Sequence, residues 1–319
     1  MHRLPPAERL ARDLDWNLLR LFLALAEAGS VTGAATRLSL KQPSVSSALR
    51  RLEERVGARL IDRGPGHFVL TPAGERLRAE AEEVRAAVLR LAGSLSEAAG
   101  QVSGPVSIAL ASHVVCPLFD RVLADFHRAH PTATLTVEVM ASRDALATVA
   151  NRRASFAVCL VDVRPQALDT VVLYREAFGL FCGPPHPLFG RVDVALADLA
   201  GRSAVSFQTD RAGDALHAVA AMRRAAGLDQ RVIGLSTHLE EVRRMIEAGL
   251  GIGPLPLHVA ADDVARGRLW QLPPLSDLPL VDVHLAWHPK ARTNPAEAML
   301  LSMLRQAVAD TPVGQRIYG

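Results

Sequence analysis

The chain has 319 residues, of which 49% are hydrophobic and 22% charged, so it is long enough for two or more domains with buried cores. This composition excludes intrinsic disorder over most of the length, and the lack of an apolar run of about 18 residues excludes a transmembrane helix. The formal net charge is only +3, but residues 1–71 hold 11 basic and 7 acidic side chains, a surplus that favours an N-terminal nucleic-acid-binding module.

Three short helices are predicted within residues 15–71. Apolar residues recur at helical spacing from Trp16, and Gly29 is expected to end the first helix. Ser30 is a candidate N-cap of the second helix, and Pro43 fits the first turn of the third. A connection of about three residues between the second and third helices is typical of a helix-turn-helix.

Two short apolar runs, 60–61 and 68–70, follow this pair of helices and are joined by a turn rich in glycine and proline. They predict a small β-hairpin, which would be the wing of a winged helix. We therefore expect an all-α winged helix-turn-helix DNA-binding domain at residues 15–71. Residues 1–14 lack the apolar core of a secretory signal, and we expect them to form a flexible extension.

A long helix is predicted over residues 72–99, with Thr71 as its cap and Pro72 in its first turn. Its apolar residues are spaced 4, 3, 4, 3 and 4 apart, which is the heptad spacing of a coiled-coil seam. We expect this linker helix to pair with a second copy of the chain, the alternative being a helix that lies on its own domain. The expected seam consists of Leu77, Ala81, Val84, Val88, Leu91 and Leu95.

A hinge is predicted at residues 100–105, where glycine, serine and proline separate the long helix from alternating strands and helices. The strand–helix–strand repeats over residues 106–319 predict α/β lobes built on a mostly parallel sheet. We expect lobe I at about residues 106–164 and 275–310, and lobe II at about residues 165–274. Two such lobes favour a cleft for a small ligand between them.

Several sequence motifs resemble the LysR-type transcriptional regulators. Those in the N-terminal part are Leu18–Phe22, Gly29–Ala35, Gln42–Ser46, Arg51–Glu54, Gly57–Arg63 and Leu70–Gly74. His186–Leu188 and Ala248–Pro256 are similar to markers of the family's effector-binding domain. The resemblance covers about residues 15–309 and implies a two-lobed, periplasmic-binding-protein-like (type 2) effector domain behind the winged helix. Lys41 and Ser155 depart from the pattern, since the family commonly has serine and aspartate there.

This resemblance implies a sequence-specific transcriptional regulator and no enzyme. Its partners would be double-stranded promoter DNA, a small-molecule effector in the cleft (a small acid or an aromatic), RNA polymerase, and further copies in a homodimer or homotetramer. We expect it in the cytoplasm, on the nucleoid when bound to DNA, with no membrane partner. The rivals are a solute-binding protein, which would need an export signal, and a cytoplasmic α/β enzyme.

The third helix is the expected reading element. Its apolar stripe would be buried, so that hydroxyl, Gln and Arg side chains on the opposite face could read base edges in the major groove. Basic residues of the wing are candidates for phosphate contacts, and a solvated charged turn is the alternative. The candidate DNA-binding residues are Thr32, Lys41, Gln42, Pro43, Ser44, Ser46, Ser47, Arg50, Arg51, Arg63 and His67.

Polar residues that follow strands are the candidates for effector binding. The carboxyl ends of strands are where α/β proteins usually hold ligands, and helix N-termini bind anions well. Simple helix capping is the alternative explanation for each of them. The candidates are Ser112, His113, Ser142, Phe207, Gln208, Ser236, Thr237 and His238.

No cofactor, metal site or catalytic set is predicted. Gly249–Gly253 follows a helix, whereas a dinucleotide fingerprint follows a strand, so a packed helix end is expected there. His284 and His288 could share a strand face, but further ligands at metal-binding spacing are missing. The three cysteines are scattered among apolar neighbours and are expected to be buried thiols, a redox switch being the alternative.

Overall fold

The computed structural model describes residues 15–64, 67–97, 102–112, 114–163, 165–209, 215–291 and 293–319, and only the backbone of residues 89–97. The chain divides into two compact units, Met1–Ala92 and Gly93–Gly319. None of the helices within the described residues is both long and apolar enough to cross a membrane.

The first unit contains the three predicted helices and the wing. Its elements are α2 (Trp16–Ala28), α3 (Val31–Leu38), α4 (Gln42–Val56), β1 (Ile61–Gly64), β2 (His67–Leu70) and the start of α5 (Pro72–Glu97). Two signals act as predicted: the Ser30 side chain accepts a hydrogen bond from the Gly33 amide, and Gly29 ends α2 in the left-handed conformation. Gly57 ends α4 in the same conformation. Phe22, at 0% exposure, lies in the shared core of these helices.

The wing is fixed to the helices by hydrogen bonds that are mostly half-buried. The Glu53 carboxylate of α4 accepts hydrogen bonds from the backbone N of Leu60 (2.9 Å) and of Ile61 (3.4 Å). Thr71 donates to the Arg59 carbonyl at 2.7 Å and also accepts from the Gly74 amide. A side chain at position 74 would collide with the Leu60 carbonyl, so glycine is required where α5 passes the wing. Helix α4 and the wing are thereby held in one orientation.

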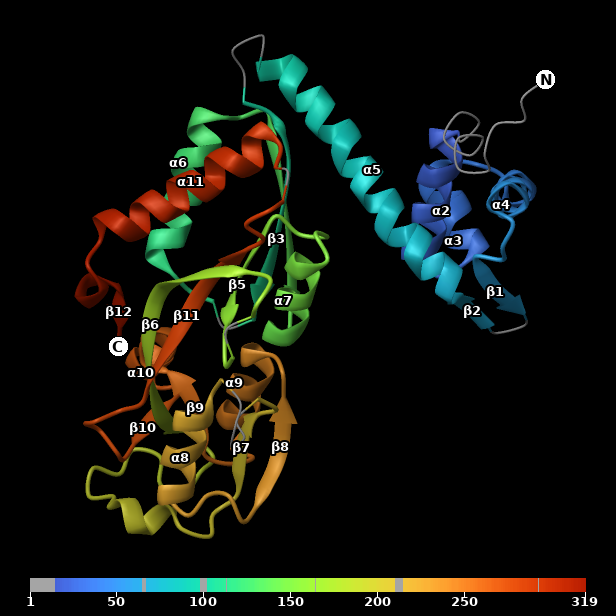
Figure 1. Cartoon of the computed structure of the whole chain (residues 1–319). Helices are drawn as coiled ribbons and strands as arrows, with labels where there is room; N and C mark the ends of the chain where they lie inside the picture. Colours follow the sequence, from blue (N-terminus) through green and yellow to red (C-terminus); the bar gives the residue numbers. More distant parts are fainter. Residues whose placement is uncertain are drawn as a thin grey trace, which may run out of the picture. The chain divides into compact units, whose positions relative to one another are not determined.

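The second unit is a mixed α/β domain (Figure 1). Its larger sheet has the strand order β10-β6-β11-β5-β3-β4, and β9 and β12 also pair with β6. Strands β7 and β8 form a separate two-stranded sheet. Its strands are β3 (Gly104–Ala111), β4 (Ala133–Met140), β5 (Phe156–Leu160), β6 (Asp169–Cys182), β7 (Ala204–Phe207), β8 (Val232–Ser236), β9 (Gly253–Pro256), β10 (Trp270–Leu272), β11 (Leu280–Trp287) and β12 (Ile317–Tyr318). Its helices are α6 (Pro117–Ala129), α7 (Ser142–Ala150), α8 (His217–Ala225), α9 (Leu239–Glu247), α10 (Leu257–Ala265) and α11 (Pro295–Asp310), with 3-10 turns at Leu196–Leu199 and Val313–Arg316.

Successive side chains of β3 point to opposite faces of the sheet, and this explains why helices cover both faces in lobe I. Val106 and Ile108 belong to the core that contains α6 and α11, whereas Ala109 and Ala111 belong to the core under α7. Figure 1 shows α6 and α11 on one side of β3 and α7 on the other. The expected parallel pairing holds for β3, β4 and β5, but β11 runs antiparallel to β5 and β6, so the sheet is mixed.

Two predicted boundaries are wrong. Strand β3 begins at Gly104, inside the expected hinge at residues 100–105, because Gly104 and the residue after it pair with β4. The boundary near residue 165 between the lobes is also wrong, since β6 pairs with β11 of lobe I as far as Ala177 and with β9 of lobe II from Phe178. Helix α6 begins at Pro117, and Cys116 is its N-cap.

Candidate functional site

The exposed side of α4 contains the predicted DNA-reading residues. Val45, Leu49 and Leu52 are buried at 0% exposure, which fixes the rotation of the helix. As a result Lys41, Gln42, Pro43, Ser44, Ser47, Arg50 and Arg51 are exposed, and Ser46 is half-buried. The structure thus brings these candidates together on one surface.

Thr32 of α3 contacts the start of α4 on the same exposed surface. The Gln42 Nε2 donates a hydrogen bond to the Thr32 Oγ1 at 3.1 Å, and both side chains are exposed. This contact joins the starts of α3 and α4 and orients the Gln42 amide. Gln42 therefore has a positioning partner that the sequence pattern did not show.

The charges on this surface are solvated. Arg50 lies 3.8 Å from Glu54 with both side chains about two-thirds exposed, so the pair is weak and leaves the guanidinium able to turn towards a phosphate or base. Lys41 occupies the N-cap position of α4 but provides no capping hydrogen bond. A positive side chain at a helix N-terminus opposes the helix dipole, and it gains a favourable partner only when an anion approaches.

In the wing, Arg63 and His67 are exposed on β1 and β2. His67 lies 3.3 Å from the carboxylate of Asp62. Arg63 is the directly paired residue of Phe68 across the hairpin. Both candidates therefore remain accessible from solvent.

Fewer residues of the expected seam on α5 are available to a second chain than the heptad spacing predicts. Ala81 is 1% exposed in the core of the first unit and is not available to a second chain, whereas Leu77, which packs against that core, is half-buried. Val84 and Val88 are 41% and 43% exposed and remain candidates for a partner surface. The side chains of Leu91 and Leu95 lie outside the described part of the chain.

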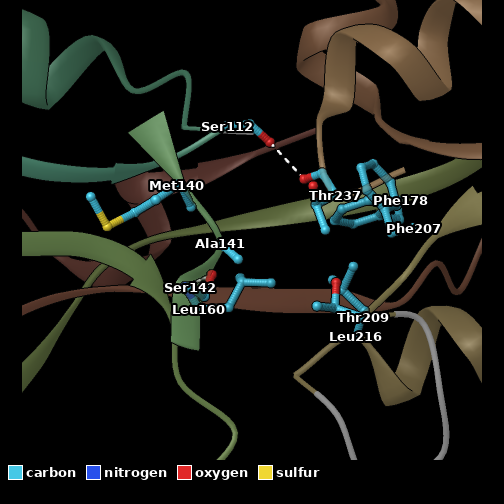
Figure 2. Close-up of a pocket in the computed structure, with 11 residues that line it drawn as sticks. Ser112, Met140, Ala141, Ser142, Leu160, Phe178, Phe207, Thr209, Leu216 and Thr237 are labelled. Carbon is cyan, nitrogen blue, oxygen red and sulfur yellow. Dashed lines mark hydrogen bonds between the residues drawn. The ribbon is translucent and has the colours of Figure 1, made fainter. Parts of the chain in front are cut away.

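A pocket of about 380 Å³, counting the solvent in its mouth, lies where lobe I meets lobe II. Figure 2 shows Ser112, Ala141, Ser142 and Leu160 of lobe I facing residues of lobe II. Hydroxyl groups alternate with apolar walls in its lining. The lining residues are Ala111, Ser112, Met140, Ala141, Ser142, Leu160, Phe178, Phe207, Thr209, Leu216 and Thr237.

The Ser112 hydroxyl joins the two lobes. It donates to the Thr237 carbonyl at 3.1 Å and accepts from the Leu239 backbone N at 3.2 Å (Figure 2 draws the first). Leu239 is the first residue of α9, whose N-cap, His238, makes no side-chain capping bond. Ser112 therefore caps a helix of the opposite lobe and not the next helix of its own lobe, since α6 starts five residues later.

Four of the predicted effector residues line the pocket, namely Ser112, Ser142, Phe207 and Thr237. The Ser142 hydroxyl already accepts a hydrogen bond from the Leu160 amide at 3.1 Å. Three other predicted residues, whose effector roles stay predictions, are not among those that line this pocket. Gln208 and His238 are exposed outside it, and the Ser236 hydroxyl accepts from the His238 amide in a local turn. His113 lies outside the described residues.

Sequence reasoning missed most of the apolar lining. Met140 and Leu160 end their strands at the pocket, as Phe207 does, so the same rule about strand ends would have found them if it had not been restricted to polar residues. Phe178 could not be found in this way, because it lies within β6 and reaches the pocket only where that strand enters lobe II.

The cysteines and the paired histidines contribute nothing to these sites. Cys116, Cys159 and Cys182 are free and buried, as predicted. Burial raises the pKa of Cys159 and of Cys182 to about 12, so both thiols stay protonated at neutral pH. Within the described residues no group of three or more His, Cys, Asp or Glu side chains could hold a metal ion.

Comparisons with known proteins match both units. The model for a "LysR substrate binding domain" matches residues 99–309, and that for a "Bacterial regulatory helix-turn-helix protein, lysR family" matches residues 16–75. A "Hydrogen peroxide-inducible genes activator" of Dickeya chrysanthemi is 28% identical over 279 residues, which are 87% of this chain and 89% of the relative.

Two solved structures share the fold. Full-length CbnR complexed with its target DNA has a TM-score of 0.64 and 22% identity, covering 92% of this chain and 100% of CbnR. Full-length LysG of Corynebacterium glutamicum with a bound effector Arg has a TM-score of 0.55 and 22% identity, covering 93% of this chain and 99% of LysG. At this identity the likeness shows the arrangement of the chain and not a shared ligand.

Proposed function

Because this chain belongs to the lysR family of bacterial regulators, we propose that the start and the exposed face of α4 enter the major groove of DNA and that the wing contacts phosphates. The chain is a DNA-binding transcriptional regulator with an effector-binding domain. The observation that carries this assignment is the burial of Val45, Leu49 and Leu52, since it leaves the polar side of α4 facing solvent.

Lys41 and Arg50 are assigned different tasks on this surface. Lys41 lies at the uncapped N-terminus of α4, where a phosphate is the anion that the helix dipole and the ammonium group both favour. Arg50 lies two turns further along and is held only by a weak pair, so it is free to make a bidentate contact with guanine. Gln42, oriented by Thr32, is assigned to an adenine edge.

The pocket between the lobes is proposed as the effector site. Its hydroxyl groups and its Met, Leu and Phe walls suit a small molecule with one polar end and one apolar end, such as an aromatic acid. The amides of the first turn of α7 open beside Ala141, which provides no capping side chain, and helix N-termini favour carboxylates. That LysG holds an arginine effector supports an effector role for this domain but not the same ligand.

Peroxide sensing through thiols is not part of the proposal, although the Dickeya relative is named for it. Peroxide reacts with thiolates that solvent can reach. All three cysteines of this chain are buried, and burial raises the pKa of each. Equal DNA binding before and after peroxide treatment is the expected result.

The remaining partners follow from this reading. The chain is proposed to act as a homodimer or a homotetramer, paired in part through the exposed portion of α5. It is proposed to bind promoter DNA on the nucleoid and to contact RNA polymerase there. Neither a solute-binding protein nor an enzyme is favoured, because the winged helix has no role in either.

A mobility-shift assay with genomic fragments that flank the gene tests the DNA assignment. The full chain should retard at least one fragment specifically at moderate salt, whereas binding that does not discriminate between fragments would contradict it. A thermal-shift screen of small carboxylates and aromatics tests the pocket. A ligand at one hundred times its Kd stabilises the folded state by about 2.7 kcal/mol.

A further inference from the structure

The last four residues of the chain lie against the hinge between the lobes. Strand β12 pairs in parallel with β6, with Ile317 opposite Arg175 and Tyr318 opposite Glu176. These positions immediately precede the point, between Ala177 and Phe178, at which β6 leaves lobe I for lobe II. Figure 1 shows this C-terminal end beside β6 and α10.

Arg316 anchors the segment to lobe I. Its side chain is 5% exposed, and its guanidinium donates to the carbonyls of Val172 (2.5 Å) and Leu173 (2.7 Å) in β6 and to that of Thr311 (2.8 Å). Charged donors to buried carbonyls are among the stronger hydrogen bonds in proteins. The segment is therefore attached to the hinge strand by side-chain and backbone bonds together.

Tyr318 contacts both lobes. On lobe I its ring centroid lies 5.3 Å from that of Tyr174, and its hydroxyl lies 3.9 Å from the Cys116 sulfur. On lobe II its ring lies 5.6 Å from that of His258, at the start of α10. Partial burial raises the pKa of Tyr318 to about 12.

His258 reaches across the same junction. Its Nε2 donates to the carbonyl of Val115 in lobe I at 3.0 Å, because a carbonyl can only accept. The imidazole is also in edge contact with Tyr174 at 6.3 Å. A change in the angle between the lobes must therefore move His258 relative to Val115, Tyr174 and Tyr318 together.

We propose that residues 316–319 are a strap across the hinge, in which Tyr318 is a positioning residue that sets the angle between the two lobes. The inference rests on the proposed function, since the lobe angle matters only if an effector acts through it. Packed interfaces of this kind have discrete arrangements, and a group wedged between two lobes biases which of them is populated. The strap would thereby set how much effector the regulator needs.

The test measures the lobe angle in the full chain without DNA or effector. Spin labels at Val163→Cys in lobe I and Val192→Cys in lobe II report the distance, since these side chains are 74% and 90% exposed whereas the native cysteines are buried. Labelled chains are diluted with unlabelled ones to remove distances between copies. Tyr318→Ala is compared with Ile317→Ala, whose side chain is exposed on the same strand.

Tyr318→Ala should shift the mean distance by more than about 2 Å, or broaden its distribution, while Ile317→Ala should match the wild type. A Tyr318→Ala distribution identical to that of the wild type would overturn the strap. If Tyr318→Ala loses its cooperative melt, Tyr318→Leu keeps apolar volume and should show the same shift, and loss of folding in both variants would also overturn the proposal. The two experiments fail independently. If Tyr318→Ala leaves the distance between the lobes unchanged, the strap is overturned while the full chain can still retard DNA. If no DNA fragment is retarded, the proposed function is overturned while the distances between the lobes still test the strap.

Discussion

The Ser112 hydroxyl of lobe I accepts a hydrogen bond from the backbone N of Leu239 in lobe II at 3.2 Å, and so caps a helix that is 127 residues away in the sequence. With its second bond, to the Thr237 carbonyl, it joins the two lobes at the pocket. An effector that binds the same hydroxyl must compete with both bonds. The effector and the contact between the lobes are thereby coupled through one side chain.

Ser112→Ala should lower the free energy of unfolding of the second unit by about 1–3 kcal/mol, because two hydrogen bonds of about 0.5–1.5 kcal/mol each are lost. Urea denaturation of the full chain measures this. Ser276→Ala is the matched control, since its exposed hydroxyl bonds to the neighbouring Asp277 and not to the opposite lobe within the described residues. A loss no larger than that of the control would contradict the structural role of Ser112.

Ser112→Ala combined with Thr237→Val should abolish the response to an effector found by thermal shift, yet leave basal DNA binding intact. Neither residue lies in the first unit, and both line the pocket. Mobility shifts titrated with that effector report both properties. If the effector concentration at the midpoint of the titration is unchanged, the effector binds elsewhere.

Gln42→Ala and Arg50→Ala should each weaken binding to the specific fragment by about 1–3 kcal/mol, the usual discrimination provided by a bidentate base contact. Arg128→Ala removes the same charge as Arg50→Ala from an exposed side chain of the second unit and is the control. Thr32→Val separates the two parts of the Gln42 effect, since it removes only the positioning bond. Operator affinities equal to those of the wild type for Gln42→Ala and Arg50→Ala would show that the wrong face of α4 has been assigned.

Lys41→Ser should change stability and DNA affinity in opposite directions. A serine at this N-cap position adds the missing capping bond and should stabilise the first unit by about 1 kcal/mol. The lost ammonium should weaken binding on every fragment and reduce the salt-dependence slope by about 1. Thermal melts and salt titrations measure the two effects, and an unchanged salt slope would mean that Lys41 does not contact a phosphate.

Val84→Glu should dissociate copies that pair through α5, because it places a charge on an exposed position of the seam. DNA affinity should fall with it, since a tethered second domain binds at high effective concentration. Ala79→Glu adds the same charge at an exposed position outside the seam and should leave the assembly unchanged. Sedimentation velocity decides the question, and an unchanged assembly for Val84→Glu would exclude this part of α5 from the interface.

Glu176→Gln should change how stability depends on pH. Burial holds the pKa of Glu176 well above its ordinary value of 4.5, so the folded state keeps a proton that the unfolded chain has released. The free energy of unfolding therefore falls as the pH rises above 4.5, by up to about 1.4 kcal/mol per unit until the folded-state pKa is passed. Thermal melts from pH 5 to 8 should show a smaller decline for Glu176→Gln than for the wild type, and equal declines would contradict the prediction.

Local signals in the sequence determined the helices and the DNA-reading face. Ser30, Gly29 and Gly57 act within one or two turns of their own position, so their capping roles can be recognised without the rest of the chain. The period of Val45, Leu49 and Leu52 likewise fixes which side of α4 is buried. These features depend on contacts between near neighbours in the sequence.

Tertiary structure decided the features that depend on distant segments. Heptad spacing could not show that Ala81 packs into its own unit while Val84 faces solvent, because both fit the same repeat. Nothing near Ser112 in the sequence indicates that its hydroxyl caps α9, and nothing near Tyr318 indicates the hinge. Such contacts join residues that are far apart in the sequence, so a long stretch of chain must be closed into a loop before they can form. Their geometry is therefore set by the packing of the whole domain and not by any local pattern.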